Sequence, residues 1–155
     1  MCGIFGLLNY KNKEIILNDI EQMSNAGKHR GPESSNLIFS VNNKDIAFGF
    51  HRLAINGLSA VSDQPFDIDN CVLICNGEIY NYKKLYSDLN IIPKTNSDCE
   101  VIIYLYRKFG IENTVQMLDG VFSFILHDNI NDKIYIARDP YGVRPLFKYK
   151  LNSNS

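Results

Sequence analysis

Short runs of β-branched and aromatic residues, separated by brief polar turns, recur along most of this 155-residue chain. The clearest pair covers residues 121–128 and 133–138, with only Asn129-Ile130-Asn131-Asp132 between the two runs. So short a connection closes an antiparallel hairpin, because parallel strands need a crossover of about a dozen residues or more. The pattern therefore predicts antiparallel sheets. Further strands are expected at residues 2–9, 36–41, 45–51 and 70–76, and through Leu146 and Phe147.

Helical periodicity interrupts the strands in two places. The first is residues 14–27, where Ile16, Ile20 and Met23 recur at helical spacing and Gly27 lies near the end. An amphipathic helix is therefore expected directly after the first strand.

The second helical cluster centres on a helix that begins near Val101 and is expected to end at Gly110. Ser97 and Glu100 have the spacing of a capping box before this helix. Shorter helices are expected at residues 80–89 and 111–118. The apolar face of the central helix comprises Val101, Ile102, Leu105, Tyr106 and Phe109. With strands predominant and helices grouped, the sequence predicts one α+β domain over residues 1–155.

The charge balance of the chain excludes some classes of partner. The net charge is −1 and no dense basic block occurs, so the charge pattern of a nucleic-acid-binding protein is absent. No apolar run is long enough to span a bilayer. The apolar stretch from Ile4 to Leu8 is too short for a secretory signal and lacks its basic start. We therefore expect a cytoplasmic protein that binds neither nucleic acid nor membrane.

The cysteines at positions 2, 71, 75 and 99 raise the questions of disulfides and of zinc. Disulfides have no support from a secretion signal. Cys71 and Cys75 share one predicted strand, where positions four apart are separated by roughly 13 Å. Two ligands of one zinc ion lie much closer, because each Zn–S bond is about 2.3 Å. We therefore expect no metal site, and we expect Cys71, Cys75 and Cys99 to be small core residues.

Cys2 is a candidate nucleophile because of its position in the chain. Methionine aminopeptidase removes Met1 when residue 2 is small, which leaves a thiol and a free α-amine on one residue. The α-amine has a reference pKa of about 7.7–8.0 and the thiol about 8.5, so the amine can accept the thiol proton. No histidine is then required as a base. The alternative is that Cys2 is a buried strand residue without chemistry.

Asn76-Gly77 is a strong turn signal at the end of a predicted buried strand. A turn at this point can aim the Asn76 amide and the Gly77 N–H at one position. Such a pair of donors stabilises the oxyanion of a tetrahedral intermediate. The alternative is an ordinary type I′ hairpin turn.

Arg52, Glu78 and Asp98 could together bind a free amino acid, which carries a carboxylate and an ammonium group. An arginine fork suits the carboxylate, and two acidic side chains suit the ammonium. The alternatives are that Asp98 complements a helix dipole and that Arg52 and Glu78 are surface charges. Spacing alone leaves both interpretations open.

Seven motifs are distributed along nearly the whole chain. They are Met1-Cys2-Gly3-Ile4, His29-Arg30-Gly31-Pro32-Glu33, Phe48-Gly49-Phe50-His51-Arg52-Leu53-Ala54-Ile55, Asn76-Gly77-Glu78-Ile79-Tyr80-Asn81, Asp98, Leu118-Asp119-Gly120-Val121-Phe122, and Arg138-Asp139-Pro140-Tyr141-Gly142-Val143-Arg144-Pro145-Leu146. In this order they resemble the glutaminase domain of class II glutamine amidotransferases. Within that class the chain is most similar to the asparagine synthetases of eukaryotic type. Relatives that make other products usually lack a glutamate at the position of Glu78.

The resemblance implies a fold and a catalytic group. The fold is the N-terminal-nucleophile hydrolase sandwich, in which two antiparallel sheets are covered by helices in four αββα layers. Cys2 would be the nucleophile and its α-amine the base. The side chain of Asn76 and the N–H of Gly77 would form the oxyanion hole. The reaction would be hydrolysis of L-glutamine to L-glutamate and ammonia through a thioester on Cys2.

The resemblance also implies how glutamine is recognised. Arg52 would hold the α-carboxylate, while Glu78 and Asp98 would hold the α-ammonium. Leu53 and Ile55 belong to the loop that lines the pocket. Asn76 and Gly77 would contact the substrate as well as the oxyanion. No cofactor is implied for this glutaminase step.

Relatives in this class continue beyond the length of this chain. Their additional strands lead into a synthetase domain with a Ser-Gly-Gly-x-Asp-Ser loop for ATP, and this loop does not occur here. The resemblance therefore implies an incomplete C-terminal end of the domain, with ATP and magnesium belonging to an absent synthetase domain. A partner chain carrying that domain, or self-association, would be expected in asparagine biosynthesis. The alternative is a catalytically silent domain that acts as a binding or regulatory module.

Overall fold

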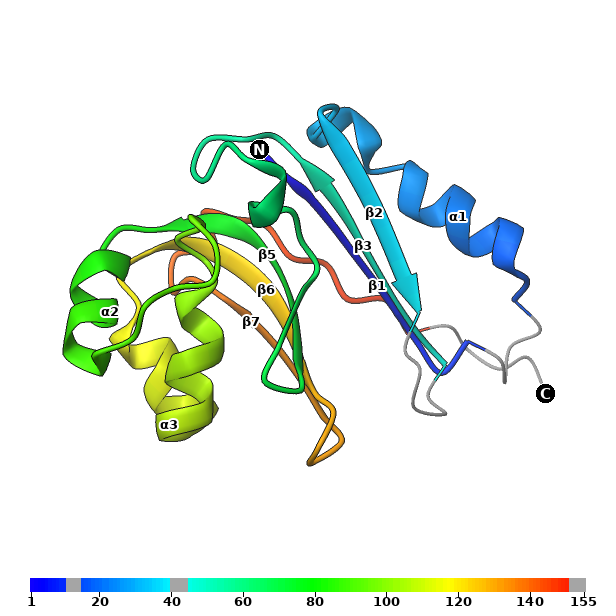
Figure 1. Cartoon of the computed structure of the whole chain (residues 1–155). Coiled ribbons are helices and arrows are strands. Elements are labelled where there is room, and N and C mark those ends of the chain that lie inside the picture. The colour runs from blue at the N-terminus through cyan, green and yellow to red at the C-terminus, as the bar shows by residue number, and fades with distance from the viewer. Residues whose placement is uncertain (11–14, 40–44, 151–155) are drawn as a thin grey trace.

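The protein is a four-layer sandwich in which two β-sheets face each other and helices cover their outer faces (Figure 1). The computed structural model describes residues 1–10, 15–39 and 45–150. Every strand pair is antiparallel, as the short connections predict. The predicted α+β class and αββα layering are confirmed.

The first sheet has the strand order β1-β3-β2 and carries helix α1 on its outer face (Figure 1). Ile20 of α1 is fully buried against Ala47 of the central strand, while Met23 stays 41% exposed. The predicted helix over 14–27 is confirmed at its centre, and its first residue lies outside the described chain. The elements are β1 (Gly3–Leu8), α1 (Leu17–Asn25), a 3-10 turn η2 (Lys28–Arg30), β2 (Ser34–Phe39) and β3 (Ile46–Arg52).

The second sheet has the order β4-β5-β6-β7. Its β6–β7 pair is the predicted hairpin, in register from Ser123 opposite Arg138 to Asp128 opposite Lys133. Strand β5 pairs with β6 along its whole length, but β4 reaches only its first three residues. The elements are a 3-10 turn η3 (Ala60–Ser62), β4 (Phe66–Ile68), β5 (Cys71–Ile79), β6 (Gly120–Asp128) and β7 (Lys133–Arg138).

Helices α2 (Tyr82–Leu89) and α3 (Val101–Met117) cover the second sheet. Gly110 interrupts α3 with a φ of 76°, a conformation that glycine adopts without steric cost. The sequence predicted that one helix ends at Gly110 and another begins after it. In the structure both belong to α3, with a kink at Gly110. No helix in the described part of the chain has the length and apolar character needed to cross a membrane.

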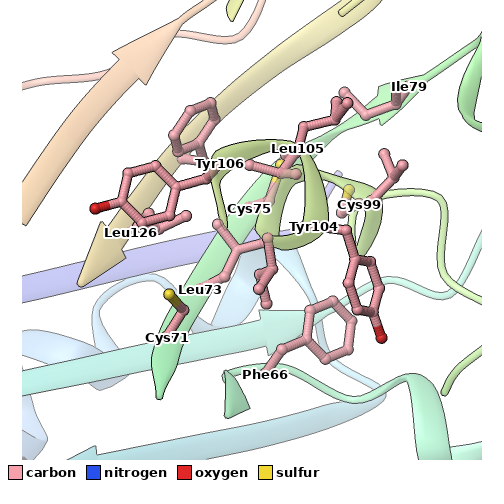
Figure 2. Close-up of a cluster of buried hydrophobic side chains, with 14 of the residues drawn as sticks. Phe66, Cys71, Leu73, Cys75, Ile79, Cys99, Tyr104, Leu105, Tyr106 and Leu126 are labelled. Atoms are coloured by element: carbon pink, nitrogen blue, oxygen red, sulfur yellow. The ribbon is translucent and has the colours of Figure 1, made fainter. Parts of the chain in front are cut away.

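Alternate residues of β5 belong to two different cores. Cys71, Leu73 and Cys75 pack under α3, as Figure 2 shows, together with Leu105 and Leu126. The side chains of the even-numbered residues in the same stretch, such as Ile74, face the first sheet. Strand β5 therefore joins the helical layer to the space between the sheets.

Two local predictions are wrong. Ser97 and Glu100 do not form a capping box, because the Glu100 carboxylate accepts the backbone N–H groups of Lys94 and Thr95 instead. Glu100 stabilises the loop that leads into α3 and leaves no side-chain cap at its start. The segment through Leu146 and Phe147 is not a strand, and the Phe147 side chain is 93% exposed. A strand needs a neighbouring strand to bond its backbone, and within the described residues none pairs with this segment.

Candidate active site

One pocket lies where β3 and β5 end and the loop after β3 begins. It holds about 340 Å³ of empty space, which includes the solvent at its open mouth. The predicted site residues Cys2, Arg52, Leu53, Ile55, Gly77 and Asp98 all line it. Asn76 and Glu78 are not among the lining residues, although both lie on the same strand as Gly77.

The Cys2 sulfur is held by the backbone of one residue. Leu53 donates its N–H to the sulfur at 3.4 Å, and the thiol donates to the Leu53 carbonyl at 3.5 Å. Burial raises the pKa of the Cys2 thiol, so the neutral thiol is favoured. In the chain as it stands, the nitrogen of Cys2 is an amide because Met1 precedes it. Removal of Met1, whose side chain is 48% exposed, would turn that nitrogen into a basic amine beside the thiol.

Arg30 supports the nucleophile, and the sequence assigned it no role. Its Nε donates to the carbonyl oxygen of Cys2 at 3.2 Å. In the same motif, the Glu33 carboxylate accepts the N–H of Ala54 at 3.0 Å. The His29–Glu33 motif therefore orients both Cys2 and the pocket loop. The motif itself was the only sequence signal for these two contacts. Each contact joins residues that are more than 20 positions apart in the chain, so local patterns could not predict it.

Asn76 and Gly77 do not form the predicted turn. Strand β5 continues to Ile79, with Asn76 opposite Ser123 and Gly77 opposite Phe122. A Cβ at residue 77 would lie 2.7 Å from the Phe122 Cα, so glycine permits close approach of β6 rather than a change of direction. The turn signal was misleading because pairing along β6 outweighs the local preference.

The backbone alternation of β5 gives Gly77 a defined direction. The N–H groups of Cys75 and Ile79 both point away from β6, to side chains of Gln64 and Asp98 respectively. Because every second residue of a strand points to the same edge, the Gly77 N–H points to this edge too. This edge faces the pocket, so the Gly77 amide is available to a bound ligand.

Asn76 is buried on the opposite face of the strand from Cys75. It continues the row of Val72 and Ile74, whose side chains pack in the intersheet core with Cys2. The Asn76 side chain thus lies on the side of β5 that faces the first sheet, whose strand β1 follows Cys2.

Asp98 is a buried carboxylate just before α3. One carboxylate oxygen accepts the Ile79 N–H at 2.6 Å. Burial raises the pKa of Asp98, and the negative charge of nearby Glu78 raises it further, against the lowering effect of the backbone hydrogen bond. The negative charge of Glu78 thus acts on Asp98, which lines the pocket, and this favours a cationic ligand group beside Asp98.

Arg52 ends β3 with its side chain buried. The guanidinium contacts the Asp63 carboxylate and the carbonyl oxygens of Gly57 and Ser59, the last at 3.1 Å. The pocket loop is thus wrapped around Arg52. The charge predicted to bind a substrate carboxylate already has an acidic partner in this arrangement.

Cys71, Cys75 and Cys99 are buried and form no disulfide, in agreement with their prediction as small core residues. Cys75 and Cys99 also line the pocket, a position that the sequence did not indicate. The Cys99 sulfur lies 3.8 Å from an Asp98 carboxylate oxygen. Across residues 1–10, 15–39 and 45–150, no group of three histidine, cysteine or acidic side chains is placed to hold a metal ion.

Comparison with known proteins shows the family to which the chain belongs. The model of the glutamine amidotransferase domain family matches residues 1–155. The chain is 39% identical to a probable glutamine-hydrolysing asparagine synthetase of Acanthamoeba polyphaga mimivirus, over 95% of this chain and 27% of the relative. It is 41% and 42% identical to the glutamine-hydrolysing asparagine synthetases of Gallus gallus and Bos taurus, over 96% of this chain and 26% of each relative.

The chain thus spans about a quarter of the length of these curated relatives. The match covers the first strand with Cys2, the pocket loop and the strand with Gly77, as well as both sheets. Since the family model matches the whole chain, this protein is a member of the glutamine amidotransferase domain family.

Proposed function

We propose that the protein hydrolyses L-glutamine to L-glutamate and ammonia through a γ-glutamyl thioester on Cys2. The observation that carries the proposal is that Cys2, Gly77 and Asp98 line one pocket. A nucleophile, an oxyanion donor and a counter-charge for an amino group are the parts that this reaction needs. Membership of the amidotransferase family supports glutamine as the substrate.

The proposed chemistry begins after Met1 is removed. The free α-amine of Cys2 accepts the thiol proton, and the thiolate attacks the side-chain amide carbon of glutamine. The negative charge on the amide oxygen is stabilised by the Gly77 N–H and the Asn76 side chain. Collapse of this intermediate expels ammonia, with the proton returned by the α-ammonium. Water then attacks the thioester and releases glutamate.

Recognition of glutamine uses charge at two ends of the pocket. Asp98 and Glu78 bind the α-ammonium, and in support of this pairing the negative charge of Glu78 adds to burial in raising the pKa of Asp98. Arg52 binds the α-carboxylate from the end of β3, and Leu53 and Ile55 form the pocket wall.

The proposed destination of the ammonia is asparagine synthesis, as the names of the relatives suggest. The proposed compartment is the cytoplasm. The glutaminase step uses no cofactor in this proposal. ATP and magnesium would be bound by a synthetase domain, in a longer polypeptide or in a partner chain, and self-association is a further option for assembly.

A second candidate function is a catalytically silent amidotransferase fold that binds a partner or regulates one. The contact of Arg52 with Asp63 favours it, because this arrangement satisfies the arginine without a substrate. The two candidates differ in whether a thioester forms on Cys2.

The test is glutamine-dependent ammonia release by protein without Met1, with hydroxylamine added to trap the thioester as γ-glutamyl hydroxamate. We expect wild-type protein and Cys71→Ala to form both products and Cys2→Ala to form neither. Cys71 is the matched control because it is a buried cysteine on β5 that does not line the pocket. Absence of hydroxamate from folded wild-type protein would favour the silent module.

A further inference from the structure

The free edge of β5 is completed by side chains instead of by a strand. Strand β4 pairs only with the residues from Cys71 to Leu73, so within the described part of the chain no strand lies beside the next backbone groups on that edge. On this edge the Gln64 side chain accepts the Cys75 N–H at 2.6 Å and donates to the Cys75 carbonyl at 3.2 Å. A carboxamide has one acceptor and one donor group, so it bonds Cys75 as a peptide group of a neighbouring strand would.

The next outward-facing backbone groups along this edge belong to Gly77 and Ile79. Asp98 accepts the Ile79 N–H at 2.6 Å. Gln64 and Asp98 therefore bond the residues on either side of Gly77, and the Gly77 amide lies between them where the pocket lining is formed. Side chains therefore fix the edge of β5 at Cys75 and at Ile79. The Gly77 N–H, which the proposed reaction uses as a donor, lies between these two residues.

Gln64 is itself held rigidly between the two sheets. Its side chain is buried and it lines the pocket. Its backbone carbonyl accepts a hydrogen bond from Asn36 of β2 at 2.9 Å. Its neighbour Asp63 contacts Arg52 at the end of β3. The backbone of Gln64 is thus bonded to the first sheet through Asn36. Its side-chain carboxamide is bonded to β5, the strand that carries Gly77.

We propose that Gln64 is a positioning residue for the oxyanion hole, which acts by fixing Cys75 so that the Gly77 N–H points at the reacting oxygen. This inference rests on the proposed function for its catalytic consequence. The oxyanion exists only after attack, so loss of its alignment lowers kcat and leaves glutamine binding unchanged. Gln64 touches neither the thiol nor the leaving group in this assignment.

The first experiment measures kcat and KM for glutamine in Gln64→Leu, Gln64→Glu and the control Gln22→Leu, whose side chain is exposed on α1. We expect kcat to fall at least tenfold in Gln64→Leu with KM changed less than twofold. Gln64→Glu keeps an acceptor for the Cys75 N–H but loses the donor, so its kcat should lie between those of wild type and Gln64→Leu. If Gln64→Leu does not fold, Gln64→Glu alone tests the inference.

A second measurement separates alignment of the oxyanion from general damage to the site. Alkylation of Cys2 by iodoacetamide displaces iodide directly and forms no tetrahedral oxyanion. We therefore expect the alkylation rate of Gln64→Leu and Gln64→Glu to stay within twofold of wild type. An unchanged kcat in both variants, or a parallel loss of kcat and alkylation rate, would overturn the inference.

A third measurement does not depend on glutamine hydrolysis. In amide NMR spectra, both Gln64 variants should shift the Gly77 resonance. Gln64→Leu, which removes the acceptor, should also speed hydrogen exchange at Cys75, whereas Gln22→Leu should change neither. An unaltered Gly77 resonance overturns the positioning role. Lack of ammonia release by the wild type would overturn the proposed function instead, and the NMR result would still decide whether Gln64 fixes this edge.

Discussion

The thiol of Cys2 is a weak nucleophile in the chain that still carries Met1. Burial raises its pKa, so thiolate is scarce at neutral pH, and the adjacent nitrogen is an amide that cannot accept a proton. Both obstacles are overcome by one cleavage, because it creates an amine whose reference pKa is about 7.7–8.0.

Removal of Met1 is therefore expected to be required for activity. Protein purified with Met1 intact should release ammonia at least tenfold more slowly than the processed protein, and treatment with methionine aminopeptidase should restore the rate. Intact-mass measurement on the same samples gives the processed fraction. Full activity in a sample that keeps Met1 would exclude the α-amine as the base.

Asp98 is expected to control the acid side of the pH profile. Its carboxylate must be ionised to bind an ammonium group, and burial raises its pKa above the usual value of about 3.9. The fall of kcat/KM on acidification should therefore begin at a higher pH than for an ordinary aspartate. In Asp98→Asn, kcat/KM should drop at least about tenfold, since 1.36 kcal/mol corresponds to one decade.

The same group affects folding with a defined sign. Because the folded-state pKa is raised, the contribution of Asp98 to the free energy of unfolding is complete below pH about 3.9 and is lost as pH rises through the folded-state value. Urea unfolding at several pH values should thus show Asp98→Asn gaining stability relative to wild type as pH rises.

A glutamine analogue without its α-ammonium tests the role of Asp98 in recognition. Its kcat/KM should differ little between wild type and Asp98→Asn. Equal use of glutamine and the analogue by wild type would show that Asp98 does not recognise the substrate.

Among the elements, the loop after β3 is organised around the side chain of Arg52. The guanidinium gathers Gly57, Ser59 and Asp63 around the end of the strand. The loop carries pocket-lining residues on both sides of these contacts. The charge state of Asp63 therefore bears on the field that a substrate carboxylate meets.

Asp63→Asn is expected to lower KM for glutamine severalfold while kcat is kept. Asparagine retains an acceptor for Arg52 but removes the negative charge that competes with the substrate carboxylate. Steady-state kinetics measure this, and Asp67→Asn on the exposed side of β4 is the matched control. A raised KM would instead show that the ion pair is needed to hold Arg52 in its binding position.

The elements that the sequence predicted well are those set by neighbours in the chain. The β6–β7 hairpin and the kink at Gly110 follow from short-range patterns, and both are present. Asn76-Gly77 was misassigned because the strand is extended by pairing with Ser123 and Phe122, which lie more than 40 residues away.

The site shows the same division between local and distant partners. Cys2, Gly77 and Asp98 were identified by residue type and motif, and the fold brings them to one pocket. Arg30 and Gln64 were missed because a role in holding a backbone group depends on which distant strand lies beside it. The pairing of Arg52 with Asp63 was missed because an aspartate in a loop carries no signal of its partner.

For the whole molecule, the pocket depends on two sheets that share one apolar core. Ile74 of β5 is fully buried in the layer between them, and Cys2 packs against that layer. The proposed nucleophile, next to β1, and the proposed oxyanion donor, on β5, thus belong to different sheets, and their separation is fixed by this packing.

Ile74→Ala should lower the free energy of unfolding by about 2–5 kcal/mol, the usual cost of removing a large aliphatic side chain from a core. Ile92→Ala should change it by less than about 0.5 kcal/mol, because Ile92 is 92% exposed. Urea unfolding followed by circular dichroism and by residual glutaminase activity should give one coincident transition. Separate transitions would show that the two sheets unfold independently.

The anchoring of the Cys2 sulfur to the N–H and carbonyl of Leu53 has a consequence for the evolvability of the pocket. Every amino acid except proline offers the same two backbone groups, so the identity of the side chain at this position is not what holds the nucleophile. Variation at residue 53 can therefore reshape the wall that meets the substrate while the reactive atom keeps its partners. In the proposed reaction, selectivity and reactivity would be carried by different parts of one residue, which makes this position a natural starting point for changing the amide that is hydrolysed.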